Sequence, residues 1–283
     1  MPLILEQRIL APRVSWLRLA APEVAAKAEP GQFVIVRLDE KAERIPLTIV
    51  EADREKGTVV LVVQEVGRST ADLVRLEAGD EIRDLLGPLG RPTEIARVGT
   101  VVCIGGGIGV APILPQARRH REVGNRVLGI IGAQTRAALI LEEEMRAACH
   151  RLLVTTDDGS YGRKGLVTAA LAELLAEETG IASVTAIGPV PMMEAVAALT
   201  RPYGIKTIVS LNPIMVDGSG MCGGCRVTVA GETRFACVDG PEFDGHLVDF
   251  AELRRRQSFY REEERRALAA VADPKEDCRC RNA

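Results

Sequence analysis

Two patterns of hydrophobic and polar positions divide the chain near residue 98. Up to that point, short runs rich in Val, Ile and Leu follow one another closely between Pro and Gly, as in GQFVIVRLD and GTVVLVVQEVG. Strands this close together, with no long helical pattern between them, predict a small antiparallel β-barrel over residues 1–98. The helix expected within it is STADLVRLEAG, with Ser69 or Thr70 as its N-cap.

From residue 99 onwards, apolar strand-like runs alternate with helical patterns. The strand-like runs start with GTVVCIGGG and RVLGIIGAQT, continue with RLLVTTDDGS and SVTAIGPVP, and finish with KTIVSLNPIM as the last strand. Such alternation indicates a parallel, doubly wound α/β sheet over residues 99–215. Ligands of these sheets bind beyond the carboxyl ends of the strands, where the turns GGGIGVAP, TTDDGSYG and AIGPVPMM are all expected.

A glycine-rich segment, DGSGMCGGCRVTVAGETRFAC, has the most distinctive chemistry. Asp217, Cys222, Cys225 and Cys237 have the spacing at which plant-type iron–sulfur proteins place four cysteines, with an aspartate in first position. Three thiolates and a carboxylate can hold a 2Fe–2S cluster, and glycine N–H groups can point at the sulfurs. A zinc knuckle and uncoordinated thiols are the alternatives, and an Asp alone in a loop is typical of a turn. Residues 216–245 are predicted to bind the cluster.

Residues 246–283 are expected to form a C-terminal helix and a tail. The segment ELRRRQSFYREEERRALAAVA has the i,i+4 charge pairs of a solvated helix, with a docking helix as the alternative. Cys278 and Cys280 lie in the terminal CRCRNA, which indicates a frayed tail or else a second metal site or partner contact. Cys103 and Cys149 lie in apolar runs and are expected in the core.

Charge and hydropathy exclude some classes of function. The chain has 36 Lys and Arg against 39 Asp and Glu, a formal net charge of −3, which gives no electrostatic case for binding nucleic acid or an anionic membrane. No apolar run reaches about 18 residues, so no membrane span is expected. The N-terminal MPLILEQRIL is too short an apolar run for a signal peptide. With its thiols expected to be reduced, the chain is predicted to be cytoplasmic.

Several motifs indicate nucleotide cofactors, each weakly when taken alone. The turn between the first strand and helix of the α/β region contains Gly105, Gly106, Gly107 and Gly109. Its N–H groups and the helix N-terminus can cradle a pyrophosphate, although tight strand–helix turns need glycine in any case. Asp157 and Asp158 end a strand and can bind a ribose or simply form a turn. RIPLT at 44–48 and GRST at 67–70 supply an Arg and a helix N-terminus, which are both anion binders.

Taken in order, these motifs resemble those of the ferredoxin–NADP reductase superfamily. RIPLT and GRST come first, GGGIGVAP, TDDGSYG and GPVPMM follow, and the cysteine loop comes last. Within the superfamily, nearly the whole chain resembles the electron-transfer subunits of dihydroorotate dehydrogenase B and their relatives. The resemblance implies an FAD-binding barrel, a nicotinamide-nucleotide domain and a 2Fe–2S segment. It also implies that electrons pass between NAD(H), FAD and the cluster, with no acid–base catalyst because the cofactors carry the chemistry.

The resemblance also assigns roles to individual residues. The flavin and its phosphates would be lined by Arg44, Pro46, Leu47 and Thr48, and the FAD pyrophosphate would be held by Gly67, Ser69 and Thr70. The nicotinamide dinucleotide would contact Gly105 to Gly109, with Gly188, Pro189 and Met192 near its nicotinamide end. NAD(H) is expected ahead of NADP(H), because Asp157 and Asp158 would repel a 2′-phosphate, although Arg163 and Lys164 lie nearby.

Asp217 distinguishes two related families. The dihydroorotate dehydrogenase subunits typically have cysteine there, whereas LNPIMVDGSGMCGGCRV and FACVDGPEFDGH resemble the small subunits of NADH-dependent ferredoxin:NADP oxidoreductases, also called sulfide dehydrogenase beta subunits. That resemblance implies an electron-bifurcating complex with a larger glutamate-synthase-like flavoprotein that carries 4Fe–4S clusters and serves ferredoxin. The alternatives are a subunit of pyrimidine synthesis, a stand-alone ferredoxin–NAD(P) reductase, and a non-enzymatic redox sensor.

Overall fold

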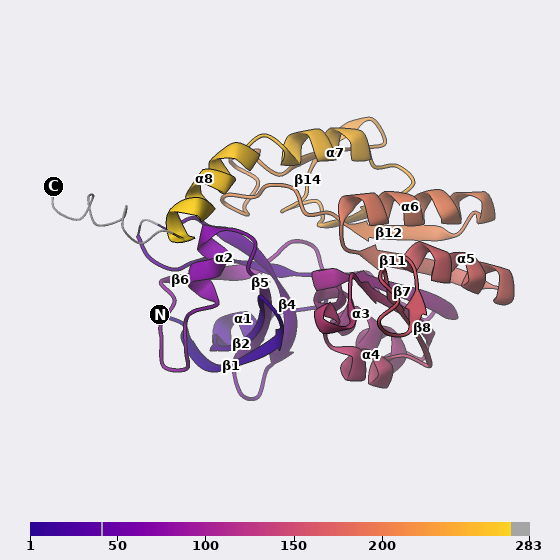
Figure 1. Ribbon diagram of the computed structural model, residues 1–283, viewed down its shortest axis with the longest axis horizontal. Coiled ribbons are helices and arrows are strands. Elements are labelled where there is room, and N and C mark those ends of the chain that lie inside the picture. Colours follow the sequence, from indigo (N-terminus) through magenta and orange to yellow (C-terminus); the bar gives the residue numbers. More distant parts are fainter. Residues whose placement is uncertain (41, 273–283) are drawn as a thin grey trace.

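The computed structural model describes residues 1–40 and 42–272, which form two β-sheets, a small hairpin and surrounding helices (Figure 1). The first sheet has the strand order β1-β2-β5-β4-β3-β6, and every pairing in it is antiparallel. Its strands are β1 (Leu3–Ala11), β2 (Val14–Ala20), β3 (Phe33–Arg37), β4 (Ile45–Asp53), β5 (Thr58–Gln64) and β6 (Asp84–Leu89). The sheet curls into the predicted barrel, since β1 bonds to residues 79–82 just before β6.

Short helices cover the ends of the barrel, and one of them begins differently from the prediction. They are α1 (Pro22–Ala25) and α2 (Arg68–Leu73). The N-cap of α2 is Gly67, in extended conformation, so the prediction of Ser69 or Thr70 as N-cap was wrong. The Thr70 hydroxyl lies inside the first turn and reaches back to accept the N–H groups of Gly67 (3.0 Å) and Val66 (2.9 Å). A hydroxyl can therefore stabilise a helix start from its third position as well as from the cap.

The second sheet is doubly wound, as predicted, with the order β10-β9-β8-β7-β11-β12-β15. Its parallel strands are β7 (Thr100–Gly106), β8 (Arg126–Ala133), β9 (Arg151–Thr156), β10 (Arg163–Lys164), β11 (Ile181–Ile187) and β12 (Lys206–Ser210). Helices α3 (Val110–Glu122) and α4 (Glu142–Ala148) pack on one face, and α5 (Val167–Glu177) and α6 (Val190–Thr200) on the other. Alternate residues of β7 supply the two cores, Val101 and Cys103 on one side and Val102 and Ile104 on the other.

The edge of this sheet departs from the prediction. A further strand, β15 (Glu242–Asp244), pairs antiparallel with β12, so β12 is not the last strand and the sheet is not wholly parallel. The chain reaches β15 only after the cysteine-rich segment, which contains the hairpin of β13 (Arg226–Val229) and β14 (Glu232–Phe235). By covering the open edge of β12, β15 satisfies its backbone groups and fixes the cysteine-rich segment to the α/β sheet at both ends.

The C-terminal charged segment forms two helices in place of the single helix that was predicted. These are α7 (Phe250–Gln257) and α8 (Arg261–Ala272), separated by residues 258–260. Asp249 caps α7 by accepting the N–H of Glu252 (2.8 Å). Phe250 and Leu253 are buried against α6, so α7 is a packed helix, while α8 lies beside α2 (Figure 1). Cys278 and Cys280 lie outside the described residues.

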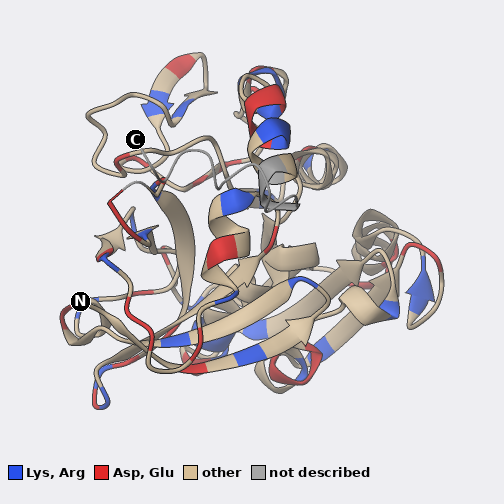
Figure 2. Cartoon of the chain, turned by 60° about the vertical axis from the view of Figure 1, so that its left-hand side comes forward, with Lys and Arg blue, Asp and Glu red and all other residues tan. Residues whose placement is uncertain are grey.

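The remaining surface features can be followed in Figure 2. Charged residues of both signs are interspersed along the ribbon, including the C-terminal helices. Within residues 1–40 and 42–272, no helix is long and apolar enough to cross a membrane.

Cys103 and Cys149 are buried as expected, and burial raises the pKa of both thiols, that of Cys149 to about 11. Both are core residues.

A carboxyl group joins three parts of the fold. Glu242 of β15 accepts hydrogen bonds from the Thr93 hydroxyl (2.9 Å), between the two sheets, and from the Gln116 side-chain amide (2.5 Å) on α3. Burial raises the pKa of Glu242 to about 7, although both hydrogen bonds act to lower it. Desolvation of the charged form is therefore the stronger effect at this junction.

We expect this carboxyl to make stability depend on pH. An acid whose pKa is raised by folding stabilises the folded state below its unfolded pKa, and that stabilisation is lost as the pH rises through the folded pKa. The affected range is from about pH 4.5 to about pH 7. Across it, the free energy of unfolding of the wild type should fall by about 3 kcal/mol relative to Glu242→Gln, measured by urea unfolding at a series of pH values.

Glu144→Gln provides the control, because Glu144 is an exposed acidic residue on α4. This variant should keep the pH dependence of the wild type. Parallel curves for the wild type and Glu242→Gln would contradict the prediction.

Candidate functional site

The glycine turn after β7 has one position that is open to a ligand. Gly105, Gly106 and Gly109 are fixed by packing, because a Cβ at any of them would collide with neighbouring atoms; at Gly109 it would meet the Ile187 carbonyl oxygen. Gly107 is different: its φ is +57°, and nothing lies within 4 Å of where its Cβ would be. Close strand–helix packing explains three of the glycines, and an open approach to the start of α3 is left at Gly107.

The GPVPMM turn lies directly against this glycine turn. Pro189 is the N-cap of α6, and a Cβ on Gly188 would lie 2.8 Å from Cε of Met192. The Met192 sulfur also occupies the space where a Cβ on Gly106 would be. The structure therefore brings together the residues predicted for the nicotinamide end, at the carboxyl ends of the neighbouring strands β7 and β11.

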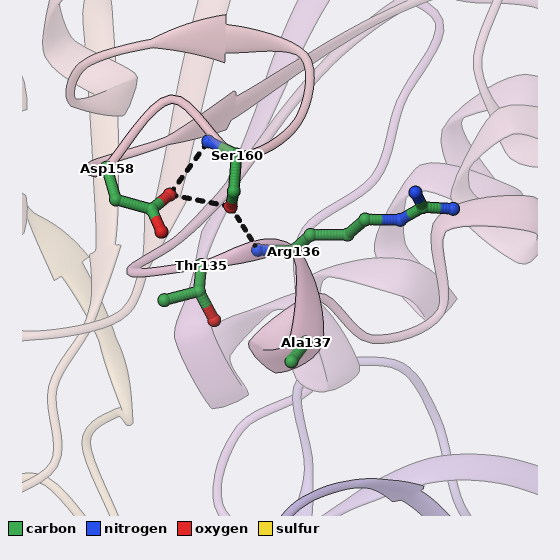
Figure 3. Close-up of a pocket in the computed structure, with 5 residues that line it drawn as sticks. All are labelled: Thr135, Arg136, Ala137, Asp158 and Ser160. Carbon is green, nitrogen blue, oxygen red and sulfur yellow. Dashed lines mark hydrogen bonds between the residues drawn. The ribbon is translucent and has the colours of Figure 1, made fainter.

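A shallow cavity of about 530 Å³ lies at the carboxyl ends of β8 and β9 (Figure 3). It is lined by Thr135, Arg136, Ala137, Asp158 and Ser160. One carboxylate oxygen of Asp158 accepts both the N–H (2.9 Å) and the hydroxyl (2.6 Å) of Ser160, and the Ser160 oxygen accepts the N–H of Arg136 (2.9 Å). The Ser160 hydroxyl lowers the pKa of Asp158, which favours its anionic form at this site.

Sequence reasoning identified Asp158 but missed Arg136. The guanidinium of Arg136 lies 5.1 Å from the centre of the Tyr161 ring, a cation–π arrangement beside the cavity. Arg163, by contrast, forms an ion pair with Glu173 and is not among the lining residues. Asp157 is exposed and does not line the cavity either. The cavity therefore offers one anionic and one cationic side chain. The only signal for Arg136 was its place directly after Gln134 and Thr135, the polar end of the strand-like run RVLGIIGAQT.

The two barrel motifs meet at one hydrogen bond. The Ser69 hydroxyl donates to Glu43 (2.8 Å), the residue just before Arg44, and so brings GRST beside RIPLT. Arg44 is exposed, with no ion pair among residues 1–40 and 42–272. Three partly buried residues of β4 follow it: Pro46, Leu47 and Thr48. Gly67 has open space on its Cβ side. An arginine and a helix start thus lie close together at the barrel, which suits a phosphate ligand.

The four predicted cluster ligands lie on one loop and its hairpin. The carboxylate of Asp217 accepts the N–H of Ser219 (2.8 Å) through one oxygen and the N–H of Cys222 (2.7 Å) through the other. The backbone N–H of Ser219 is the main cause that lowers the pKa of Asp217. Cys222 is exposed, and its sulfur accepts the N–H of Gly224 (3.4 Å). Asp217 and Cys222 are therefore held as one pair.

Cys225 and Cys237 form a second pair. Both are buried, with their sulfurs 3.1 Å apart. Burial, and next the hydrogen bond with Cys225, raise the pKa of Cys237 to about 12. Among the residues that the structure describes, no three or more His, Cys, Asp or Glu side chains are gathered as a metal site. A cluster of two irons takes two protein ligands on each iron, so this donor set, arranged as two pairs, fits it better than a single ion.

The ligand loop packs on β3 and β6, and β3 pairs with β4, the strand that carries RIPLT. Gly218 has a φ of +74°, and a Cβ there would lie 2.8 Å from side-chain carbons of Ile35 and Leu89. Ile35 is the cross-strand partner of Pro46, so their side chains share a face of the barrel. Arg91 fixes the far side of the loop by donating to the carbonyl of Val238 (3.2 Å). The predicted flavin and cluster positions are therefore neighbours.

Comparison with known proteins identifies the family. Residues 212–249 match the model of the iron-sulfur cluster binding domain of dihydroorotate dehydrogenase B, and residues 103–198 match that of the oxidoreductase NAD-binding domain. A Thermotoga maritima protein, a homolog of the dihydroorotate dehydrogenase B (NAD(+)) electron transfer subunit, is 48% identical over 87% of this chain and 86% of its own. The chain belongs to the family of dihydroorotate dehydrogenase B electron-transfer subunits and their homologues.

Two further proteins support this family assignment. The electron transfer subunit of Geobacillus thermodenitrificans is 36% identical, over 85% of this chain and 94% of its own. A chain from a solved structure of NADH-dependent reduced ferredoxin-NADP oxidoreductase, studied for flavin-based electron bifurcation, superposes with a TM-score of 0.92. It is 43% identical, with 96% of this chain and 98% of that chain covered. The chain is an oxidoreductase subunit, and these findings support FAD, a 2Fe–2S cluster and NAD(H) as its cofactors.

We expect Asp158 to set the preference for NAD over NADP. Its carboxylate would repel a 2′-phosphate in the cavity, so Asp158→Asn should raise the affinity for NADP relative to NAD by about fivefold. Arg136, which lines the same cavity, would then attract the phosphate without an opposing negative charge. The measurement is the ratio of the two dissociation constants, obtained by titrating the full chain with each nucleotide.

Asp157→Asn is the matched control, because it removes the same charge from a neighbouring exposed residue that does not line the cavity. Its ratio should stay near that of the wild type. An equal rise in both variants would mean that overall charge, and not the cavity, decides the preference.

Proposed function

We propose that this chain is the small subunit of an electron-bifurcating, NADH-dependent ferredoxin:NADP oxidoreductase. The observation that carries the proposal is the similarity of nearly the whole chain to the solved structure of such an enzyme, with a TM-score of 0.92 and 43% identity. Asp217, in the first ligand position, supports the same family. The free thiols of the described residues suit a reducing compartment, and we place the protein in the cytoplasm.

The proposal gives each group of residues a separate task. Arg44, with the start of α2 at Gly67 and Ser69, would bind the FAD phosphates, and the open side of Gly107 would admit the nicotinamide dinucleotide. Asp217 and the three loop cysteines would hold the cluster. When bound, the flavin exchanges a hydride with the nicotinamide and single electrons with the cluster. The chain itself positions the cofactors and shields them from water, and no acid–base residue is required.

The surface around the ligand loop suits a protein partner. Three apolar side chains are exposed there: Val216 (51%), Met221 (89%) and Val238 (45%). Each is the sequence neighbour of a predicted ligand. Exposed apolar residues clustered at a functional site are typical of a docking surface. We propose that a larger flavoprotein with 4Fe–4S clusters binds here and exchanges electrons with the loop, and that it connects the chain to ferredoxin.

A second candidate is the electron-transfer subunit of dihydroorotate dehydrogenase B itself. It is favoured by the match of residues 212–249 to the iron–sulfur domain of that enzyme. In that case the partner would be the dihydroorotate dehydrogenase catalytic subunit, and Asp217 would be a variant ligand. The two candidates share every cofactor and differ in the partner.

The partner therefore decides between them. Gentle affinity purification of the chain from its native cell should yield a large flavoprotein with 4Fe–4S motifs in stoichiometric amount. A dihydroorotate dehydrogenase catalytic subunit would support the second candidate, and the absence of any partner would favour a stand-alone reductase. Met221→Asp should lose the partner but keep the cluster, because a buried unpaired charge opposes docking. Ile9→Asp, at an 80% exposed position on β1, should keep both.

The ligand set has its own test. The purified full chain should contain iron and acid-labile sulfide in equal amounts, about two of each. Asp217→Cys should retain the cluster but change its reduction potential, because thiolate is a softer ligand than carboxylate. An unchanged spectrum and potential would remove Asp217 from the ligand set, and zinc without sulfide would exclude the cluster.

A further inference from the structure

Helix α7 ends against the cluster loop. Arg256, in its last turn, donates from Nη2 to the carbonyl of Gly224 (3.2 Å), one of the two residues between Cys222 and Cys225. The next residue, Gln257, donates to the carbonyl of Asn212 (2.8 Å), which precedes the loop. The end of α7 therefore holds the ligand loop at two points.

Arg256 differs from the neighbouring arginines in being partly buried without an acidic partner. Arg254 pairs with Glu194 of α6, and Arg255 is exposed, whereas Arg256 is partly buried and has no ion pair among the residues described. Its Nε atom is buried without any acceptor. The Phe259 ring, 6.0 Å from Cζ, covers another side of the guanidinium. A buried guanidinium N–H that lacks an acceptor is costly and needs an explanation.

The loop that Arg256 contacts is where a negative group would be held. Gly224 links the two: its carbonyl accepts from Arg256, and its N–H donates to the sulfur of Cys222. A cluster with four anionic protein ligands becomes more negative by one charge when it is reduced. A fixed positive charge nearby stabilises the reduced form more than the oxidised form, and so raises the reduction potential.

We propose that Arg256 is a positioning residue of the iron–sulfur centre that raises its reduction potential, through its unpaired charge and through its hold on Gly224. The inference rests on the proposed function, because it requires a cluster on the loop. It assigns the C-terminal helix α7 a part in electron transfer that neither the ligand spacing nor the charge pattern of the segment indicated.

The test is a redox titration of the cluster in the full chain, in which electron paramagnetic resonance measures the amount of reduced cluster. At a fixed applied potential, Arg256→Gln should lower the ratio of reduced to oxidised cluster about tenfold. For a one-electron couple this is a fall of about 59 mV in the reduction potential. Arg256→Lys keeps the charge and should restore most of the potential. Arg255→Gln removes the same charge from the adjacent exposed residue and should leave the ratio within about twofold of the wild type, because solvent screens exposed charges.

Each outcome decides a separate question. A wild-type chain without iron and sulfide would refute the proposed function, whereas a loaded wild type with an unchanged potential in Arg256→Gln would overturn only the role of Arg256. If Arg256→Gln holds no cluster, Arg256→Lys decides. A loaded lysine variant with a potential near that of the wild type supports the proposal. A lysine variant that also fails to load would reduce Arg256 to a structural hydrogen-bond donor and overturn it.

Discussion

The hydrogen bonds to the Glu242 carboxyl hold the two sheets and the iron–sulfur segment at a common point. Thr93 belongs to the connection between the sheets, Gln116 to a helix of the second sheet, and Glu242 to the strand that follows the ligand loop. Because β15 also pairs with β12, the loop between them begins and ends on the α/β sheet while its middle rests on the barrel. The relative placement of all three predicted cofactor sites follows from this junction.

The junction at Glu242 also brings the ligand loop close to the barrel. Electron transfer between cofactors weakens steeply with distance, so a loop that binds a cluster gains from lying next to the strand predicted to bind the flavin. Gly218 permits this, because any side chain there would push the loop away from Ile35 and Leu89. Pro46 shares the face of Ile35, so the loop and the RIPLT motif meet across one pair of strands.

The sequence predicted the parts of the fold that depend on local pattern. The barrel, the doubly wound sheet and the close spacing of Cys222 and Cys225 could all be inferred, because alternation, turns and short-range spacing are local properties. Long-range pairing was missed. The strand β15 has only three residues and follows Pro241, so its sequence gives no strand pattern, and the edge of β12 determines it instead. The break between α7 and α8 was also missed, because the charged residues before and after residues 258–260 fit one continuous helical pattern.

The candidate site likewise contains residues that the local sequence identified and residues that only the fold brings together. Asp158 could be found from its turn, which also contains Ser160, whereas Arg136 joins them only because β8 and β9 are neighbours in the sheet. The glycine turn GGGIGVAP also says less about ligand binding than its composition indicated. Three of the four glycines at the end of β7 and in the turn that follows it are required by packing, and only Gly107 faces open space. The motif is therefore mainly a packing signal, and its value for binding lies in a single residue.

Helix α7 connects the nucleotide-binding sheet to the cluster loop. It packs on α6 through Phe250 and Leu253, and Arg254 pairs with Glu194 there. Since α6 begins at Pro189, beside the glycine turn, one layer of two helices extends from the predicted nicotinamide end to Gly224. Helix α7 is therefore a structural link between the nucleotide-binding sheet and the predicted cluster loop.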